Sequence, residues 1–113
     1  MTQQGARYEE TKELGIAAVA ALIRKDIKAA KAKGDLPDRI YVKLQVWCNR
    51  AAIYVFYTRV DANPFIQRRL ETIVEAYNNV TFATPAPIRF GRARYFMQVR
   101  YGMPASGTSR AIE

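Results

Sequence analysis

The chain has 113 residues, half of them hydrophobic, and a formal net charge of +8 at pH 7. This length fits a single domain, and the N-terminal MTQQGARYEE lacks the basic-then-apolar order of a signal peptide. No apolar run is long enough to cross a bilayer, and the single cysteine, Cys48, excludes an internal disulfide. We therefore expect a cytoplasmic protein without membrane contact, whose partner is nucleic acid or an acidic protein surface.

The first predicted element is a helix from Thr11 to Lys33, with Thr11 as its N-cap and Gly34 at its end. Its apolar stripe consists of Ile16, Val19, Ile23, Ile27 and Ala30. The exposed side carries a basic ridge, defined here as Arg24, Lys28 and Lys31, with Lys25 beside it. The ridge is either a solvated face that suits the helix macrodipole or a surface that contacts a ligand.

Two strands are predicted next. Ile40, Val42, Leu44 and Val46 alternate with Tyr41, Lys43, Gln45 and Trp47, which is the strand period. After a short polar interruption, the run AAIYVFYTRV at 51–60 is β-branched and aromatic on both parities. It predicts a second strand, folded back as a hairpin, covered on both faces and central in the sheet.

A second helix is predicted over residues 64–78, with Asn63 as its cap and Pro64 at its first position. Asn78 and Asn79 end it, and a short strand over 80–83 is an option. The prolines of TPAPI, at 85 and 87, predict an extended connection into the last strand.

The last predicted strand is RFGRARYFMQVRY, from Arg89 to Tyr101. One parity holds Ala93, Tyr95, Met97, Val99 and Tyr101, and the other holds Arg92, Arg94, Phe96, Gln98 and Arg100. The first set suits a core. The second set is either a working surface or only a solvated one.

Together these elements predict an α+β fold in the order α-β-β-α-β. We expect a two-layer sandwich in which two helices cover one face of a three- to four-stranded, mostly antiparallel sheet. Residues 1–103 form the predicted single domain, and residues 104–113 a flexible C-terminal tail. The uncovered face would gather Arg92, Arg94, Phe96 and Arg100 with Lys43 and Trp47.

Catalytic motifs are scarce in this sequence. It has no histidine, which excludes histidine bases, histidine metal sites and histidine-activated nucleophiles, and it has no P-loop. The carboxylate pairs Glu71/Glu75 and Glu9/Glu13 lie among basic neighbours and indicate surface charge. We predict a protein that is not an enzyme and uses no metal or cofactor.

Nucleic-acid binding is suggested by the basic and aromatic residues on one strand face. Cations contact phosphates, and rings stack on unpaired bases. The helix-first order and RARYFMQVRY do not supply the aromatic motif of an RNA-recognition fold. A homodimer that buries the same rings, with arginines at its rim, is an alternative.

The first helix, TKELGIAAVAALIRKDIKAA, resembles the start of a large polyvalent protein-associated domain of phages and conjugative elements, number twenty-nine in that series. The match rests on Leu22, Ile23, Arg24, Lys25, Ile27 and Lys28, and LETIVEAYNN is similar to a later helix of the family. The resemblance implies a mobile-element protein that counters host defences, as anti-CRISPR proteins do. It assigns no catalytic residue and does not extend to the strand at 89–101.

The leading hypothesis from the sequence is therefore a phage or mobile-element protein that inhibits a host defence complex by occupying a surface. The binding residues it uses are Arg92, Arg94, Arg100, Lys43, Arg24, Lys28 and Lys31. The alternatives are a single-stranded nucleic-acid-binding protein that uses Trp47 and Phe96, and a structural homo-oligomer.

Overall fold

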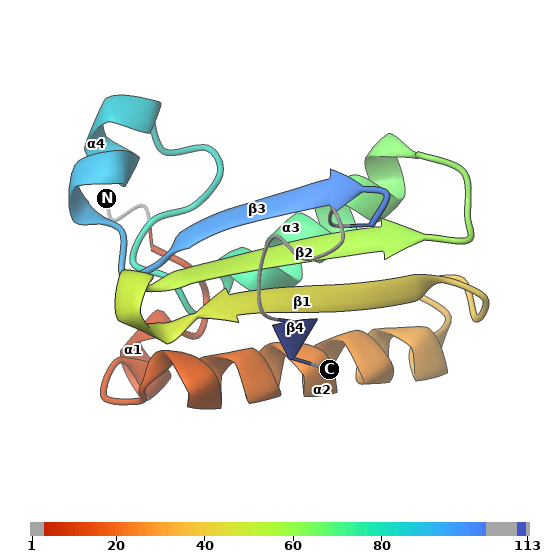
Figure 1. The fold of residues 1–113 in the computed structure, drawn as a ribbon, viewed down its shortest axis with the longest axis horizontal. Coiled ribbons are helices and arrows are strands. Elements are labelled where there is room, and N and C mark those ends of the chain that lie inside the picture. The colour runs from red at the N-terminus through yellow and green to blue at the C-terminus, as the bar shows by residue number, and fades with distance from the viewer. Residues whose placement is uncertain (1–3, 104–110, 113) are drawn as a thin grey trace.

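Helices pack on one face of a mixed sheet in the computed structural model (Figure 1). The structure describes residues 4–103 and 111–112, apart from the side chains of residues 90, 92, 111 and 112. The helices are α1 Tyr8–Thr11, α2 Ile16–Lys33, α3 Pro64–Glu75 and α4 Ala86–Arg92, and the 3-10 turn η1 is Cys48–Arg50. The strands are β1 Tyr41–Trp47, β2 Ala52–Thr58, β3 Phe96–Tyr101 and β4 Ala111–Ile112.

The sheet has the strand order β3-β2-β1-β4. β1 and β2 form an antiparallel hairpin, from the pair Tyr41↔Thr58 to the pair Trp47↔Ala52. β3 runs parallel to β2, because α3 and α4 carry the chain back to the end of the sheet where β2 begins. The predicted α+β class, the two-layer arrangement and the central position of the second strand are confirmed, with one parallel pair in the sheet.

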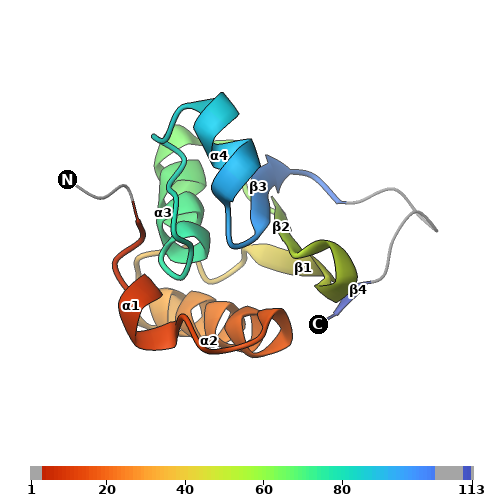
Figure 2. The same cartoon turned by 90° about the vertical axis from the view of Figure 1, so that its left-hand side faces the viewer.

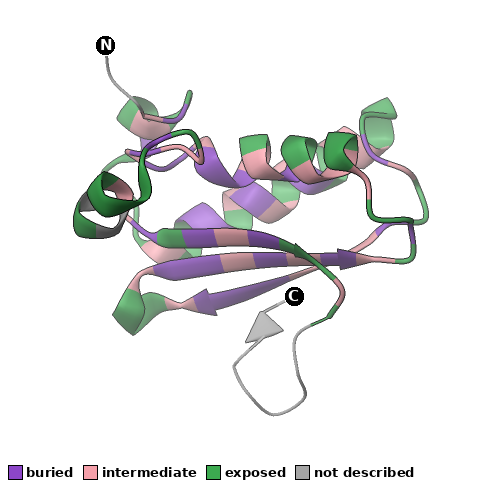
Figure 3. Cartoon of the chain, turned by 90° about the horizontal axis from the view of Figure 1, so that it is seen from above, coloured by how far each residue is buried: buried purple, intermediate pink, exposed green. Residues whose placement is uncertain are grey.

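The core lies between the sheet and the two long helices (Figures 2 and 3). The strands contribute Leu44, Val46, Ile53, Val55, Met97 and Val99, and the helices contribute Val19, Ile23, Ile27, Leu70 and Val74. Strand pairing places successive residues on this core and on the other face in turn, and Gln45 and Ala52 of the other face are themselves only 4% exposed. The second face of β2 is therefore not covered by a described helix, contrary to the prediction for this strand.

The first predicted helix is interrupted after Thr11. Thr11 ends α1 instead of capping α2, and its hydroxyl donates backwards to the carbonyl oxygen of Arg7 at 2.7 Å. The guanidinium of Arg94 donates to the carbonyl oxygens of Thr11 and Leu14, at 2.5 and 2.7 Å. In a continuous helix those two oxygens would accept from amides four residues later. At the other end Gly34 caps α2 in the left-handed region, at φ 86°, as predicted.

The predicted extended segment around the two prolines is wrong. Pro85 is the N-cap of α4 and Pro87 lies in its first turn, where a missing amide hydrogen costs nothing. The amide of Arg89 donates to the carbonyl oxygen of Pro85 at 3.0 Å. Arg89 and Arg92 therefore belong to a helix, and the last long strand begins only at Phe96.

Residues 80–83 form turns instead of the optional strand, and the Thr84 hydroxyl accepts from the amide of Thr81 at 3.0 Å. Most of the predicted tail, 104–110 and 113, lies outside the described residues. Ala111 and Ile112 pair with Gln45 and Leu44 as β4. Across residues 4–103 and 111–112, no helix combines the length and the apolar character that a membrane crossing requires.

Candidate nucleic-acid interface

The sheet face that points away from α2 and α3 is called the open face here (Figure 3). It is formed by alternate residues of β1, β2 and β3: Tyr41, Lys43, Gln45, Trp47, Ala52, Tyr54, Phe56, Thr58, Phe96, Gln98 and Arg100. Four of the predicted site residues, Lys43, Trp47, Phe96 and Arg100, lie together on it.

Strand register arranges the open face in rows that cross the three strands. One row holds Lys43, Phe56 and Arg100, so two cations flank one aromatic ring. Successive rows are separated by two residues along a strand, about 6.6 Å. The row at the α4 end of the sheet holds Trp47, Ala52 and Phe96, so two rings flank a small residue. The two rows differ in character, one cationic and one aromatic.

The aromatic side chains of the open face contact one another. The rings of Trp47 and Tyr54 meet edge to face, with centroids 4.9 Å apart and an interplanar angle of 67°. Phe96 is 41% exposed. At the opposite end of the sheet, the guanidinium of Arg59 lies 4.9 Å from the centroid of the Tyr41 ring. Aromatic surface thus reaches from one end of β1 to the other.

The charged strand residues of the open face are basic. None of the residues that β1, β2 and β3 place on it is acidic. The acidic side chains with described ion pairs lie elsewhere: Glu10 and Asp26 pair with Arg7, Glu9 pairs with Lys12, Glu71 and Glu75 pair with Arg68, and Asp35 pairs with Arg69. Part of the basic charge of the helices is therefore neutralised locally, and the charged strand residues of the open face are Lys43 and Arg100.

Arg94 does not lie on the open face, which corrects its predicted place. Its guanidinium donates to the carbonyl oxygens of Thr11, Leu14 and Tyr77, the last at 2.8 Å, and lies 5.6 Å from the Tyr8 ring centroid. Its backbone amide donates to the side-chain oxygens of Asn78 and Asn79, at 3.1 and 2.6 Å. Arg94 precedes β3, so strand alternation does not orient it, and it holds the α1–α2 junction against α3.

Arg92 does not lie on the predicted strand face either, because it belongs to α4 and not to a strand. The basic ridge of α2 lies apart from the open face as well. Arg24, Lys28 and Lys31 line a groove between α2 and β1, and the ammonium of Lys31 donates to the carbonyl oxygen of Ile40 at 3.2 Å.

Three side chains of the open face and its rim were not predicted as site residues: Tyr54, Phe56 and Arg59. The alternation of β2 could have indicated Tyr54 and Phe56. Ile53, Val55 and Tyr57 already form a complete apolar face, so the two rings must lie on the other face. Arg59 has a positive φ of 69°, which no sequence pattern here indicates.

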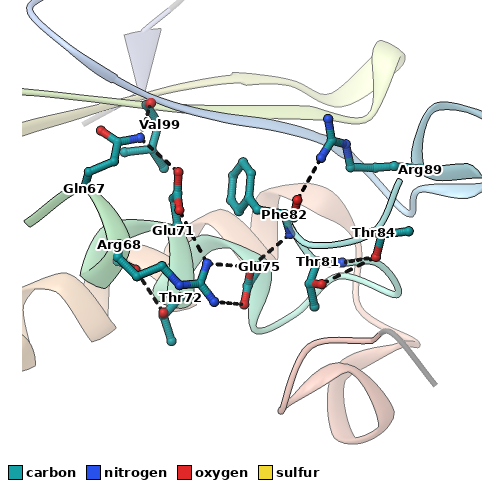
Figure 4. Close-up of polar contacts among 10 residues, drawn as sticks. All are labelled: Gln67, Arg68, Glu71, Thr72, Glu75, Thr81, Phe82, Thr84, Arg89 and Val99. Atoms are coloured by element: carbon teal, nitrogen blue, oxygen red, sulfur yellow. Dashed lines mark hydrogen bonds and ion pairs between the residues drawn. The ribbon is translucent and has the colours of Figure 1, made fainter. Parts of the chain in front are cut away.

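A polar network positions α4 beside the open face (Figure 4). The buried carboxylate of Glu75 accepts from both terminal nitrogens of Arg68, at 3.3 and 3.1 Å, and from the amide of Phe82 at 3.0 Å. The guanidinium of Arg89 donates to the carbonyl oxygen of Phe82 at 3.3 Å. Arg89 also borders a hollow of about 50 Å³ that Tyr54 and Phe96 line. The sequence analysis placed Arg89 in the predicted strand at 89–101, whereas the structure places this residue in α4.

No family model, curated protein or solved structure matches this chain. The resemblance of the first helix to a mobile-element family therefore stays a prediction.

A cleft of about 410 Å³ between α2 and α3 carries both charge signs. Beside it, the hydroxyl of the fully buried Tyr77 donates to Asp26 and accepts from Arg7 at 2.7 Å. Burial, followed by the hydrogen bond to Asp26, raises the pKa of Tyr77 above its ordinary value. The phenol therefore stays protonated at neutral pH, and its hydrogen bond to Asp26 connects α2 to the segment that follows α3.

Within the described part of the chain, no three His, Cys, Asp or Glu side chains form a cluster that could hold a metal ion.

Proposed function

We propose that the protein binds single-stranded nucleic acid on the open face. The observation that carries this proposal is the row Lys43–Phe56–Arg100, in which cations stand on both sides of a ring. An unpaired base can stack on the ring while the adjoining phosphates contact the cations. Neighbouring strands are about 4.8 Å apart, so the backbones of Lys43 and Arg100 lie on either side of Phe56, roughly 10 Å from each other.

Single strands suit this face better than duplexes do. Unpaired bases expose their faces to aromatic rings, whereas a duplex buries those faces in its own stack. The open face offers Trp47, Tyr54, Phe56 and Phe96, and each base stacked on a ring contributes about 1–3 kcal/mol. Since none of the residues that β1, β2 and β3 place on the open face is acidic, these strands bring no like charge against a phosphate backbone.

The test is binding of labelled single-stranded DNA and RNA, measured by fluorescence anisotropy at two salt concentrations. Phe56→Leu keeps an apolar side chain but removes the ring, and we expect about a tenfold weaker affinity. Arg100→Gln should weaken binding and lower the slope of log K against log salt by about 1, because one phosphate contact is lost.

Phe65→Leu is the matched control. Phe65 is 77% exposed at the start of α3, and the substitution removes a ring away from the open face. Equal losses for Phe56→Leu and Phe65→Leu, or an affinity that does not change with salt, would reject the proposal. Solution mass recorded in parallel tests the homo-oligomer alternative, in which the same rings are buried between two copies.

A second candidate is inhibition of a host defence complex by surface occupation, the anti-CRISPR-like role that the mobile-element resemblance implies. The observation in its favour is that Lys43 and Arg100 lie in one row of the open face, since a group of cations complements an acidic protein surface. In the binding experiment this function predicts no affinity for nucleic acid. Pull-downs with the Arg100→Gln variant as control would then identify the partner.

A further inference from the structure

The groove between α2 and β1 has an apolar floor. Its volume is about 250 Å³. Ile27, Ile40 and Leu44 line it, and each of them is at most 5% exposed. The partly exposed side chain of Val42 borders the same floor. A hydrocarbon group that enters the groove therefore exchanges water for apolar surroundings, which is favourable.

Helix geometry places the cations of the groove. The basic ridge, Arg24, Lys28 and Lys31, lies on the side of α2 that holds Ile27, at positions about one turn apart. The ridge thus follows the groove over seven residues of helix, about 10.5 Å. None of the described residues that line the groove is acidic, so its helix side is a basic rim above the apolar floor.

The two lysines of the ridge have donors that a bound anion can use. Lys31 donates to the carbonyl oxygen of Ile40 at 3.2 Å, and an ammonium has three N–H donors in total. Lys28 is exposed. Because α2 runs antiparallel to β1 (Figure 1), Lys31 marks the Ile40 end of the groove, and the floor continues from there towards Leu44.

The size and chemistry of the groove restrict its occupant. About 250 Å³ is less than the roughly 300–1,000 Å³ typical of a site for a drug-sized ligand, so it suits a smaller molecule. A phosphate backbone would complement the ridge but would bring no apolar group to the floor. A neutral hydrocarbon would cover the floor but would gain nothing from the ridge. A molecule with an apolar tail and an anionic head complements both.

We propose that the groove between α2 and β1 binds a small amphiphilic carboxylate, of the class of the medium-chain alkanoates. The carboxylate contacts Lys28 and Lys31, and the alkyl tail lies along the floor towards Leu44. Burial of the tail provides affinity, and the ridge selects the sign of the charge on the head group. This site does not depend on the nucleic-acid function of the open face.

The test is an amide NMR titration of the protein with unbranched alkanoates of increasing chain length, at about 0.15 M salt to screen distant charges. Octanoate is expected to bind with a Kd below about 1 mM. Each added methylene should tighten binding about fourfold while the tail still gains contact with the floor, and the gain should stop once the groove is filled. Octylammonium, which has the same tail and the opposite charge, should bind about tenfold more weakly.

Two variants test the rim and the floor separately. Lys28→Glu should weaken octanoate binding about fivefold, because an exposed cation at the groove becomes an anion. Lys25→Glu is the matched control, since Lys25 is exposed on the same helix but does not line the groove. Val42→Thr places a hydroxyl where the tail packs and should also weaken binding about fivefold, with no change in charge.

The position of the ligand is read from the amide shifts, which are expected to be largest at Ile27 in α2 and at Val42 and Leu44 in β1. The Arg100→Gln variant should bind octanoate normally, which separates this site from the open face. The proposal is overturned by equal losses for the two lysine variants, by equal binding of octanoate and octylammonium, or by shifts centred elsewhere. An affinity that keeps rising with tail length would also overturn it, because that result indicates adsorption on apolar surface in general.

Discussion

Arg94 and Arg100 are close in sequence, yet their guanidinium groups have different surroundings. Arg94 donates to three backbone carbonyl oxygens from two separate segments: those of Thr11 and Leu14 at the α1–α2 junction, and that of Tyr77 after α3. Arg100 is exposed on β3, and its described hydrogen bond is to the side chain of Gln98 at 2.5 Å. One arginine is structural, and the other is available to a ligand.

We therefore predict that Arg94→Ala lowers the free energy of unfolding by about 3 kcal/mol, because it removes charged hydrogen bonds to carbonyls inside the fold. Arg94→Lys should recover little, since an ammonium cannot reach three acceptors in the geometry of a planar fork. Urea unfolding followed by circular dichroism measures both. Arg100→Ala is the control and should stay within about 0.5 kcal/mol of the parent. Equal stability of all three variants would contradict this assignment.

The sequence predicts the placement of residues inside strands better than that of residues before them. Lys43, Trp47, Phe96 and Arg100 were placed correctly, because strand alternation alone decides which face they join. Arg94 was not, because its direction depends on the side chains of Asn78 and Asn79, which hold its amide. Such long-range contacts leave no periodic signal in the sequence.

Among the elements, those with a long hydrophobic period were predicted and those fixed by distant contacts were not. The apolar patterns of α2, β1, β2 and α3 gave these elements nearly their observed bounds. Helix α4 was missed because prolines start helices as readily as they interrupt strands. Its place depends on the network that links Arg68, Glu75, Phe82 and Arg89.

This network gives a prediction at the level of the element. Glu75→Gln should destabilise the protein by about 2 kcal/mol, because a buried charged acceptor of the Arg68 and Phe82 donors becomes a neutral amide. Amide hydrogen exchange of α4 should accelerate in parallel, since Phe82 connects Glu75 to Arg89.

Glu71→Gln is the control for the Glu75→Gln prediction. Glu71 also pairs with Arg68, at 3.4 Å, but its side chain is more exposed than that of Glu75 and it does not reach Phe82. We expect a change of less than about 0.5 kcal/mol and normal exchange in α4. Faster exchange in α4 for both variants would show that the carboxylate of Glu75 has no special part in holding this helix.

At the scale of the whole molecule, buried tyrosines couple stability to alkaline pH. Tyr77 and Tyr95 are fully buried, and Tyr95 donates to the carbonyl oxygen of Val74. Burial is the largest cause that raises the pKa of each above the ordinary value of about 10. Above that pH the native state holds protons that the unfolded state loses, so stability falls as the pH rises.

We predict a loss of about 1.4 kcal/mol per pH unit above pH 10 for each tyrosine that stays neutral in the folded protein. The midpoint of urea unfolding between pH 8 and pH 11 measures it. Tyr95→Phe removes one ionisable phenol and should make the decline shallower, although its stability at pH 8 is lower. A midpoint independent of pH across this range would rule out the coupling.

The contact between Arg94 and the junction of α1 and α2 also has a consequence for biosynthesis. Thr11 and Arg94 are separated by 83 positions, so the junction gains its contact with the Arg94 guanidinium only after the residues between them have been synthesised. At about 5–20 residues per second this interval is roughly 4–17 s. The contact between Arg94 and the junction can therefore form only late in synthesis, after most of the chain has been made.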